Sequence, residues 1–361
     1  MSNLKNKVFI EGSNLASLTA AARLAKFKYQ VTVSGQSYQN TQAGDFSFDY
    51  GPLFTLPAVY RDFFQKTGKH FGQVLEIKAM DPAFVFNFDD TQIIFANLSR
   101  NERLKEIESK LGKAAALEWD RALKQAEYLW DKVRANYFEW EFSFQRFNPD
   151  TYLRMRAINF QNPYLNKIMA NYATYLGYPA GIYKWSHLLA FVEESFGIWQ
   201  VTGGMQALID KLKDRATELG VIFANTAEFD YYIDATQTHN RPEQRLIGIE
   251  NFPDELPVRT VRFHKNGYTT DIYATRMQPG KYSLVVTGKL DILEFEPYKV
   301  FDQIRPAVFG DSDNQVLTKI RTANKRKFKV RHMDSLAHAG ITGELLANAV
   351  RGIKNRPSHE H

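Results

Sequence analysis

A glycine between a short apolar run and an Ala/Leu-rich segment is the feature of this sequence best suited to chemistry. Val8–Ile10 predicts a buried strand, Gly12 a tight turn, and Leu15–Lys26 a helix. The first backbone N–H groups of a helix have no partner within it, and the positive end of the helix dipole lies beside them. Together they can hold a pyrophosphate. Lys28–Ser34 then returns to β-branched residues, so the whole stretch predicts a βαβ unit of the dinucleotide-binding type.

The glycine fingerprint of this unit is degenerate. The pattern G-x-G-x-x-G starts at Gly12, but Asn14 replaces the second glycine and Ser17 the third. Asn tolerates a left-handed backbone, and Ser is small enough for close packing of the helix on the strand. The acidic residue that would bind ribose hydroxyls falls at Ser34–Gly35 and is missing. Two roles stay open for Asn14: it directs its amide toward a phosphate, or its side-chain oxygen caps the helix.

Composition describes an ordinary globular chain. Of the 361 residues, 44% are hydrophobic and 24% charged, with a net charge of +6, which does not argue for a nucleic-acid partner. There is no cysteine, which excludes disulfides, thiolate catalysis and Cys-ligated metals. The N-terminus enters the first strand directly and no apolar run approaches the roughly 20 residues of a membrane-spanning helix. We therefore expect a cytoplasmic protein.

The rest of the chain alternates helical and extended patterns without a repeat. Residues 36–45 read as a polar loop, 75–96 as short strands with a turn at Asp89–Asp90, and 282–287 as a buried strand. Helices are expected at 57–66, 101–140 (with Tyr128 on its inner face), 151–175 with a break at Pro163, 186–196, 206–219 and 343–353. We expect the N-terminal unit to share one sheet with 221–235, 282–287 and the C-terminal element, with Val8–Ile10 central and parallel to Val31–Ser34.

Four segments, taken in order, resemble the phytoene-desaturase-like flavoproteins, a branch of the FAD-dependent amine-oxidase-type oxidoreductases. They are the N-terminal βαβ unit, Phe48–Pro52 with the helix after it, Gly197–Met205, and His338–Glu344. Residues 162–177 are also similar to the family's segment ahead of the glycine pair. The similarity is good over residues 5–225 and returns at 330–353. No single motif is specific, but the ordered set is.

The resemblance implies the α/β class: a doubly wound FAD/NAD(P)-binding (Rossmann-like) domain with a discontinuous α+β cap or substrate domain. On this basis we assign 1–74, 200–235 and 280–361 to the first domain, and 75–199 with 236–279 to the cap. The implied activity is flavin-dependent dehydrogenation or isomerisation of an apolar, often isoprenoid, substrate, with the electron chemistry carried by FAD. The implied cofactor-binding residues are Gly12, Ser13, Asn14, Leu15, Ser34, Gly35, Asp334, Gly340 and Ile341.

The chain also departs from the family. A glycine-pair-plus-Arg signature normally follows the second strand, and Gln39–Thr41 stands there instead. The chain is short between Thr287 and Asp334, where much of the usual substrate domain is missing. Two hypotheses follow: a flavin-dependent oxidoreductase, or a non-catalytic descendant that has lost FAD and binds a partner or small ligand. An NAD(P)-dependent enzyme is a third, equally affected by the missing acid and glycine.

Other candidate chemistry is sparse. His187 and His338 are best explained as structural or capping residues, and neither H-E-x-x-H nor G-x-S-x-G occurs. The sequence therefore predicts neither a zincin-type metal site nor a hydrolase triad. The basic stretch 319–332, KIRTANKRKFKVRH, suggests one of two structures: a solvated strand, or a segment that binds anionic lipid electrostatically. The second would bring the protein into peripheral contact with a membrane.

Overall fold

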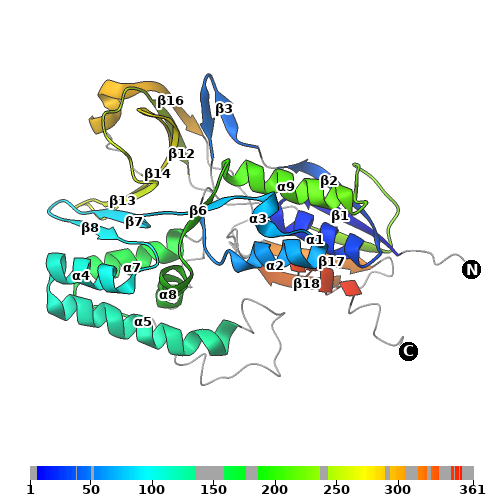
Figure 1. The fold of residues 1–361 in the computed structure, drawn as a ribbon, viewed down its shortest axis with the longest axis horizontal. Helices are drawn as coiled ribbons and strands as arrows, with labels where there is room; N and C mark the ends of the chain where they lie inside the picture. The colour runs from blue at the N-terminus through cyan, green and yellow to red at the C-terminus, as the bar shows by residue number, and fades with distance from the viewer. Residues whose placement is uncertain are drawn as a thin grey trace, which may run out of the picture.

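The protein is described from a computed structural model covering residues 6–37, 39–49, 53–134, 158–175, 186–235, 243–288, 293–305, 316–322, 327–332, 343–344, 346–348 and 350–351. Its helices are α1 (Leu15–Lys26), α2 (Ala58–Thr67), α3 (Phe71–Val74), α4 (Arg100–Leu111), α5 (Lys113–Arg134), α7 (Pro163–Tyr175), α8 (Ser186–Phe196), α9 (Gly204–Glu218) and the 3₁₀ helix η3 (Leu293–Tyr298). Two sheets organise the described part of the chain, one at each end of the molecule (Figure 1).

The first sheet has six strands in the order β10-β2-β1-β11-β17-β18. These are β10 (Ile222–Phe223), β2 (Gln30–Ser37), β1 (Lys7–Ser13), β11 (Tyr231–Asp234), β17 (Val316–Thr322) and β18 (Lys327–His332). Strand β1 is central and parallel to both β2 and β11, as predicted for the N-terminal unit. The sheet ends in an antiparallel hairpin, because β17 pairs antiparallel with both β11 and β18.

Helices α1, α2 and α9 pack on one face of this sheet and form its core. Val8, Ile10, Val31 and Val33 are at most 1% exposed beneath them, which follows from the alternation of apolar residues along the two strands. The described residues of 343–351 are helical, as expected, and join the same layer. Arg23 of α1 forms a largely buried ion pair with Glu344, at 2.6 Å.

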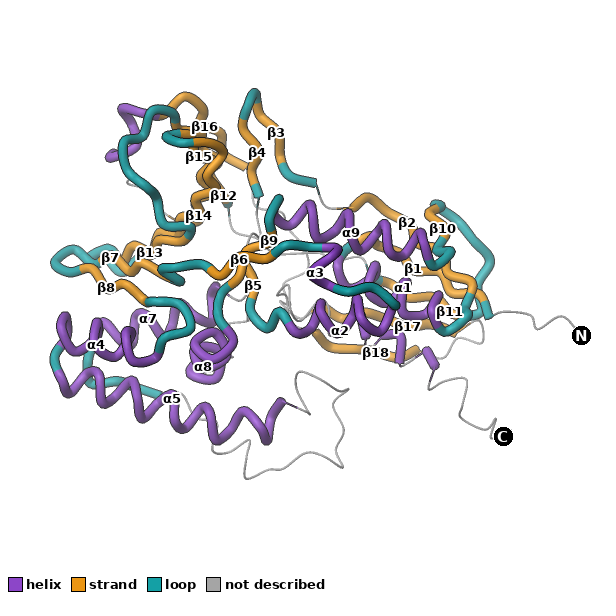
Figure 2. The backbone as a smooth tube through the Cα atoms, in the orientation of Figure 1, coloured by secondary structure: helices purple, strands orange, loops and turns teal. Residues whose placement is uncertain are grey.

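The second sheet has seven strands in the order β16-β12-β15-β14-β13-β7-β8 and curls strongly at the far end of the molecule (Figure 2). Its strands are β16 (Lys299–Arg305), β12 (Gln244–Ile249), β15 (Lys281–Gly288), β14 (Thr269–Gln278), β13 (Arg259–Phe263), β7 (Phe84–Asn87) and β8 (Gln92–Phe95). The predicted strand at 282–287 exists, but its placement beside the N-terminal unit was wrong. It lies in β15, between β12 and β14, so 280–288 goes with the cap sheet.

Helices α4, α5, α7 and α8 pack on one face of β7, β8 and β13, at one edge of the seven-stranded sheet, and make an aromatic core with them. The single helix expected at 101–140 is two helices, because Gly112 ends α4 at a φ of +88°. Tyr128 was expected inside but is 57% exposed. Helix α7 starts at Pro163, where the break was predicted.

A short sheet connects the two halves. Strand β9 (Trp199–Val201) pairs with β5 (Leu53–Phe54) and β6 (Ile77–Ala79). The loop expected at 36–45 instead contributes to β2 and to a hairpin of β3 (Thr41–Ala43) and β4 (Phe46–Phe48). Phe46 and Phe48 of this hairpin pack against Leu246 and Val285 of the seven-stranded sheet. The segment after the second strand thus fastens one half to the other.

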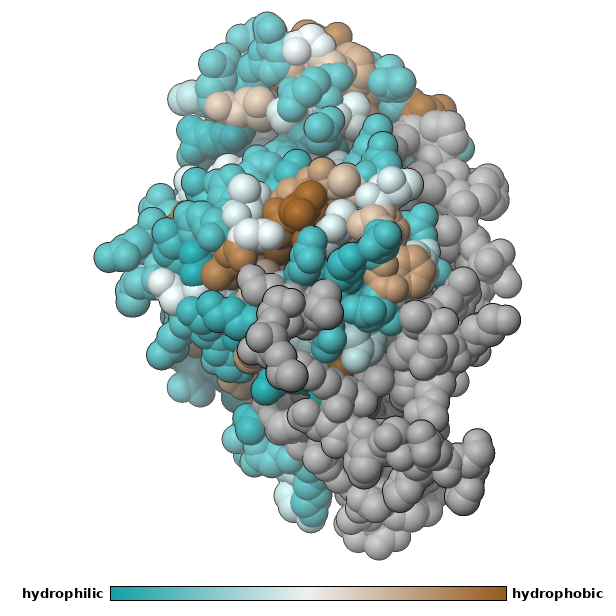
Figure 3. Space-filling model, turned by 90° about the vertical axis from the view of Figure 1, so that its right-hand side faces the viewer, coloured by the Kyte–Doolittle hydropathy of each residue, from teal (hydrophilic) through white to brown (hydrophobic). Residues whose placement is uncertain are grey.

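Two surface properties of the described residues bear on partners. No helix among them is both long and apolar enough to span a membrane. The end of the molecule formed by the six-stranded sheet is mainly hydrophilic, with small apolar patches (Figure 3). Scattered exposed side chains such as Ile222 (48%) and Phe229 (40%) are normal for a protein surface.

Candidate functional site

The predicted pyrophosphate-binding turn of the βαβ unit, called the cradle below, forms where β1 ends, α1 begins and β2 passes beside them. Gly12 and Gly35 both have positive φ, +107° and +98°. A Cβ atom on Gly35 would lie 3.4 Å from the Cα of Gly12 and 3.6 Å from the nitrogen of Ser13, so the two backbones approach closely. Positive φ favours glycine at both positions. The first glycine of the fingerprint therefore has the structural role that the sequence predicts.

Asn14 caps α1, the second of the two roles left open for it. Its side-chain oxygen accepts a hydrogen bond from the N–H of Ser17 at 3.0 Å, and the Ser17 hydroxyl accepts one from the Asn14 N–H at 2.7 Å. This is a reciprocal capping box. The Asn14 amide also donates to the carbonyl of Ala235 at 2.6 Å, which ties the start of α1 to the end of β11.

The β1–β2 ladder continues beyond the glycine turn. After a bulge at Glu11–Ser13, Ser13 pairs with Ser37, and their hydroxyls lie 2.7 Å apart. Ser13 is only 4% exposed, while Gly35 and Gln36 are exposed. The two strands are thus joined by a side-chain hydrogen bond beside the point where the fingerprint's ribose acid would stand.

The phosphate end of the cradle keeps its donors. The N–H groups of Leu15 and Ala16 have no hydrogen-bond partner in the described part of the chain, while those of Asn14 and Ser17 are taken by the capping box. Free N–H groups at the first turn of a 12-residue helix suit a phosphate. The residues present therefore fit the pyrophosphate of a dinucleotide, but they offer no carboxylate to its ribose.

Two more of the resembling segments meet away from the cradle. Asp49 is 3% exposed, and its carboxylate accepts a hydrogen bond from the N–H of Met205 at 2.7 Å, in the first turn of α9. Gly203 and Gly204 have φ values of +86° and +75°, and a Cβ on Gly204 would overlap Asp49. Asp49 of the Phe48–Pro52 segment and the Gly203–Gly204 pair thus fit together at the start of α9.

A buried polar cluster lies in the cap. Arg259 of β13 is 1% exposed and donates to both carboxylate oxygens of Asp271, at 2.7 and 3.1 Å, and to Asn171 of α7 at 3.1 Å. Arg103 of α4 is fully buried and donates from Nε to the carbonyl of Ala96 at 2.7 Å. Its two terminal nitrogens have no hydrogen-bond partner in the described part of the chain. Two guanidinium groups therefore lie within one apolar layer.

Glu193 of α8 is the acid of this cluster. It is fully buried, and neither carboxyl oxygen makes a hydrogen bond within the described residues. Burial raises the pKa of Glu193 to about 8, although Arg259, Arg103 and the Tyr172 hydroxyl pull it down. Burial also raises the pKa of the neighbouring Glu194, whose carboxylate lies 3.5 Å from Arg100. Glu193 is therefore mostly protonated at neutral pH.

His187, at the start of α8, is 1% exposed, and burial lowers its pKa to about 4. A neutral buried imidazole agrees with the structural role expected for this residue.

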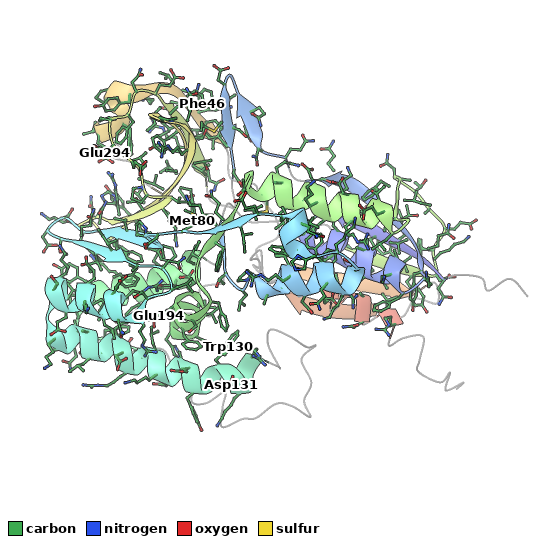
Figure 4. All side chains as sticks on the ribbon, viewed as in Figure 1. Phe46, Met80, Trp130, Asp131, Glu194 and Glu294 are labelled. Atoms are coloured by element: carbon green, nitrogen blue, oxygen red, sulfur yellow. The ribbon has the colours of Figure 1, made fainter. Side chains whose placement is uncertain are left out.

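A small pocket of about 130 Å³ opens on the face of the seven-stranded sheet away from the cap helices. Its walls include Val85, Ile272 and Phe295, and Arg262 and Glu294 form an ion pair at its rim. Glu294 and Glu194 lie on opposite sides of β7 and β13 (Figure 4). A cavity of roughly 150 Å³ admits a molecule of the size of benzene. This pocket is therefore too small for an extended isoprenoid.

The structure brings together six of the nine predicted cofactor residues: Gly12, Ser13, Asn14, Leu15, Ser34 and Gly35. Asp334, Gly340 and Ile341, like His338, lie outside the described residues, so their roles stay predictions. Sequence reasoning missed Ser37, whose signal is only its position after the second strand. It also missed the buried role of Glu193, since an acidic pair on a helix usually indicates a solvated face. No group of His, Asp or Glu able to hold a metal ion occurs among the described residues.

The two sheets, the shared cradle and the helical cap define the class: the chain has the amine-oxidase fold. It superposes on a putrescine oxidase variant with a TM-score of 0.57, at 12% identity over 97% of this chain and 99% of that one. Cyclohexylamine oxidase from Brevibacterium oxydans gives 0.56, at 11% identity over 98% and 100%. These superpositions confirm the expected fold class. The exception in the detailed arrangement is strand 282–287, which lies in the other sheet. No protein-family model matches the sequence.

Among curated proteins, the chain is similar in sequence to carotenoid-modifying proteins. The chain is 26% identical over 253 residues to a 4,4'-diapolycopene oxygenase from Methylomonas sp, covering 63% of this chain and 50% of that protein. It is 27% identical over 250 residues to a 1-hydroxycarotenoid 3,4-desaturase from Flavobacterium sp., covering 60% and 49%. These similarities confirm the resemblance to phytoene-desaturase-like proteins. The chain spans about half the length of these relatives.

Proposed function

We propose that this protein is a flavin-dependent oxidoreductase that dehydrogenates or isomerises an apolar, isoprenoid-type substrate, with FAD as its cofactor. One observation carries the proposal. The chain combines similarity to carotenoid desaturases with a βαβ cradle whose phosphate end still has free donors. The cradle lies at the carboxyl ends of central parallel strands, where ligands bind in sheets of this kind.

The chain's own residues would act mainly by holding and orienting. The N–H groups of Leu15 and Ala16 would bind the pyrophosphate, and Gly12 would let the backbone approach it. When bound, FAD would supply the electron chemistry of the reaction. The cap, 75–199 with 236–279, would cover the substrate. We add β15 and β16 to it, which the prediction had placed in the first domain, because both strands pair with β12 inside the cap sheet.

The test is flavin binding with a pair of variants that are matched in helix capping and differ in charge. Purified protein should carry flavin absorbance or gain thermal stability with added FAD. Asn14→Ser and Asn14→Asp both keep a capping oxygen, but only the second places a negative charge beside the phosphate path. We expect Asn14→Asp to lose FAD binding by tenfold or more and Asn14→Ser to lose much less, with far-UV circular dichroism unchanged for both.

The substrate is tested separately from the cofactor. Protein loaded with FAD should convert phytoene or 4,4'-diapophytoene in detergent or vesicles, followed as new polyene absorbance with an electron acceptor present. Colourless protein that gains no stability with FAD would instead indicate a descendant without the cofactor.

We also propose that the protein is cytoplasmic and touches anionic membranes through the basic stretch 319–332. The register pairs Lys319 with Lys329 and Arg321 with Lys327, so these four residues share one face of the β17–β18 hairpin. Strand β18 is the edge of the sheet. Lys and Arg near an anionic surface each add about 1 kcal/mol of attraction.

Vesicles of 30% phosphatidylserine should retain the protein in low salt and release it at high salt, whereas Lys327→Glu/Lys329→Glu should stay unbound. Retention in high salt would contradict an electrostatic contact.

A further inference from the structure

We propose that the cradle holds its cofactor by the phosphate and the flavin, and does not hold the adenosine ribose. This inference rests on the proposed function and concerns the specificity of the same site. It predicts that FMN, which lacks the adenosine half, binds about as tightly as FAD. The residues that carry it are Gly35, Ser13 and Ser37.

At the position of the ribose acid stands Gly35, and its backbone conformation disfavours an acidic side chain. In a dinucleotide-binding unit the acidic residue at the end of the second strand binds the ribose hydroxyls. Gly35, at this point, has a φ of +98°, where an L-residue is strained, and its Cβ position faces the Gly12 backbone at 3.4–3.5 Å. The Cβ contacts themselves are ordinary, but the left-handed φ makes any side chain at this position strained, and the residue present supplies no carboxylate.

The Ser13–Ser37 pair joins the two strands at the same end of the cradle. Their hydroxyl–hydroxyl hydrogen bond, 2.7 Å long, and their ladder pairing join β1 to β2 past the glycine turn. Ser13 is 4% exposed, so its hydroxyl is already used and shielded. Beside Gly35, the exposed polar side chain that β2 still presents is Gln36. Gln36 is a neutral residue and the alternative candidate for holding the ribose.

The phosphate-binding end of the cradle is unaffected by the missing acid at Gly35 and by the Ser13–Ser37 hydrogen bond. The free N–H groups of Leu15 and Ala16 lie on α1, and the capping box fixes the start of that helix. A hydrogen bond to a charged group is typically worth about tenfold or more in affinity. With the carboxylate–ribose contacts absent, FAD has no such advantage over FMN, since each flavin can bring a phosphate to the two free N–H groups.

The experiment is a set of binding titrations on the full chain stripped of flavin, followed by flavin fluorescence and repeated by equilibrium dialysis. The ligands are FAD, FMN and ADP, and the variants are Gln36→Ala and Gln30→Ala. Gln30→Ala is the matched control, because it removes an exposed glutamine from the other end of the same strand. We expect FAD and FMN dissociation constants within about threefold, weak ADP binding, and no effect of either variant on any ligand.

Each contrary result has its own meaning. FAD binding more than tenfold tighter than FMN, or ADP competing well with FAD, would overturn the inference while leaving the flavoprotein proposal standing. A loss of FAD affinity in Gln36→Ala alone, with FMN binding unchanged, would show that Gln36 holds the ribose and would also overturn it. Binding of neither flavin would refute the proposed function itself.

Discussion

Glu193 should make the folded protein less stable as the pH rises from 6.5 to 8. Burial raises its pKa from 4.5 to about 8, so the folded state holds a proton that the unfolded state has released. Stability from such a group is complete below pH 4.5 and is lost as the pH rises through 8. The slope is about 1.36 kcal/mol per pH unit, which gives about 2 kcal/mol between pH 6.5 and 8. His187, with its pKa lowered from 6.5 to about 4, has the opposite slope but only below pH 6.5.

The assay is urea unfolding from pH 6.5 to 8.5 for wild type and Glu193→Gln. The amide mimics the protonated acid in both the folded and the unfolded state, so the two proteins should be equally stable only below pH 4.5. At pH 6.5, two pH units above the unfolded pKa of 4.5, wild type should already be less stable than the variant by about 2.7 kcal/mol. Between pH 6.5 and 8.5 this difference should widen by about 2 kcal/mol, because the variant has no buried proton to lose. Glu108→Gln, an identical change at an exposed position of α4 in the same cap, is the control and should keep the wild-type slope. Equal slopes for wild type and Glu193→Gln would refute a buried, protonated Glu193.

Three further substitutions test local contacts, each by urea unfolding. Asn14→Ala should cost about 2 kcal/mol, about 1 from the cap and about 1 from the bond to Ala235, whereas Asn14→Gly should cost about half as much; equal costs would contradict the capping role. Gly204→Ala should cost about 2–4 kcal/mol, since the methyl group adds left-handed strain and displaces Asp49 from the start of α9, and a neutral effect would contradict the close approach. Arg259→Met should cost about 3 kcal/mol by leaving the partly buried carboxylate of Asp271 unpaired, and a loss below 1 kcal/mol would show that this carboxylate is solvated.

Local patterns predicted the elements well, because helices, strands and turns depend largely on interactions between residues that are close in sequence. The βαβ unit, the break at Pro163 and the hairpin turn at Asp89–Asp90 are all present. The placement of 282–287 failed, because a buried apolar strand has the same sequence pattern in either sheet. The inward face assigned to Tyr128 failed for a related reason: aromatic residues suit both a core and an exposed helix surface.

The candidate site was only partly predictable for a geometric reason. Asn14 and Ser17 stand three residues apart, so a capping box can be inferred from their spacing. The contact between Asp49 and Met205 joins residues 156 positions apart, and no local pattern indicates it. The positive φ of Gly35 likewise cannot be inferred from the sequence, which shows only that the expected acidic residue is missing.

The matches to the carotenoid desaturases and the departures from them occupy different places in the fold. Matching segments meet at structural contacts, where Asp49 accepts a hydrogen bond from the first turn of α9 and Glu344 pairs with Arg23. The described departures gather at the ribose end of the cradle, around Gly35 and in the segment that becomes the β3–β4 hairpin. The donors at the start of α1 lie between these regions and are intact. A cofactor held there must therefore be selected by its phosphate and flavin, and comparing FMN with FAD tests that selection directly.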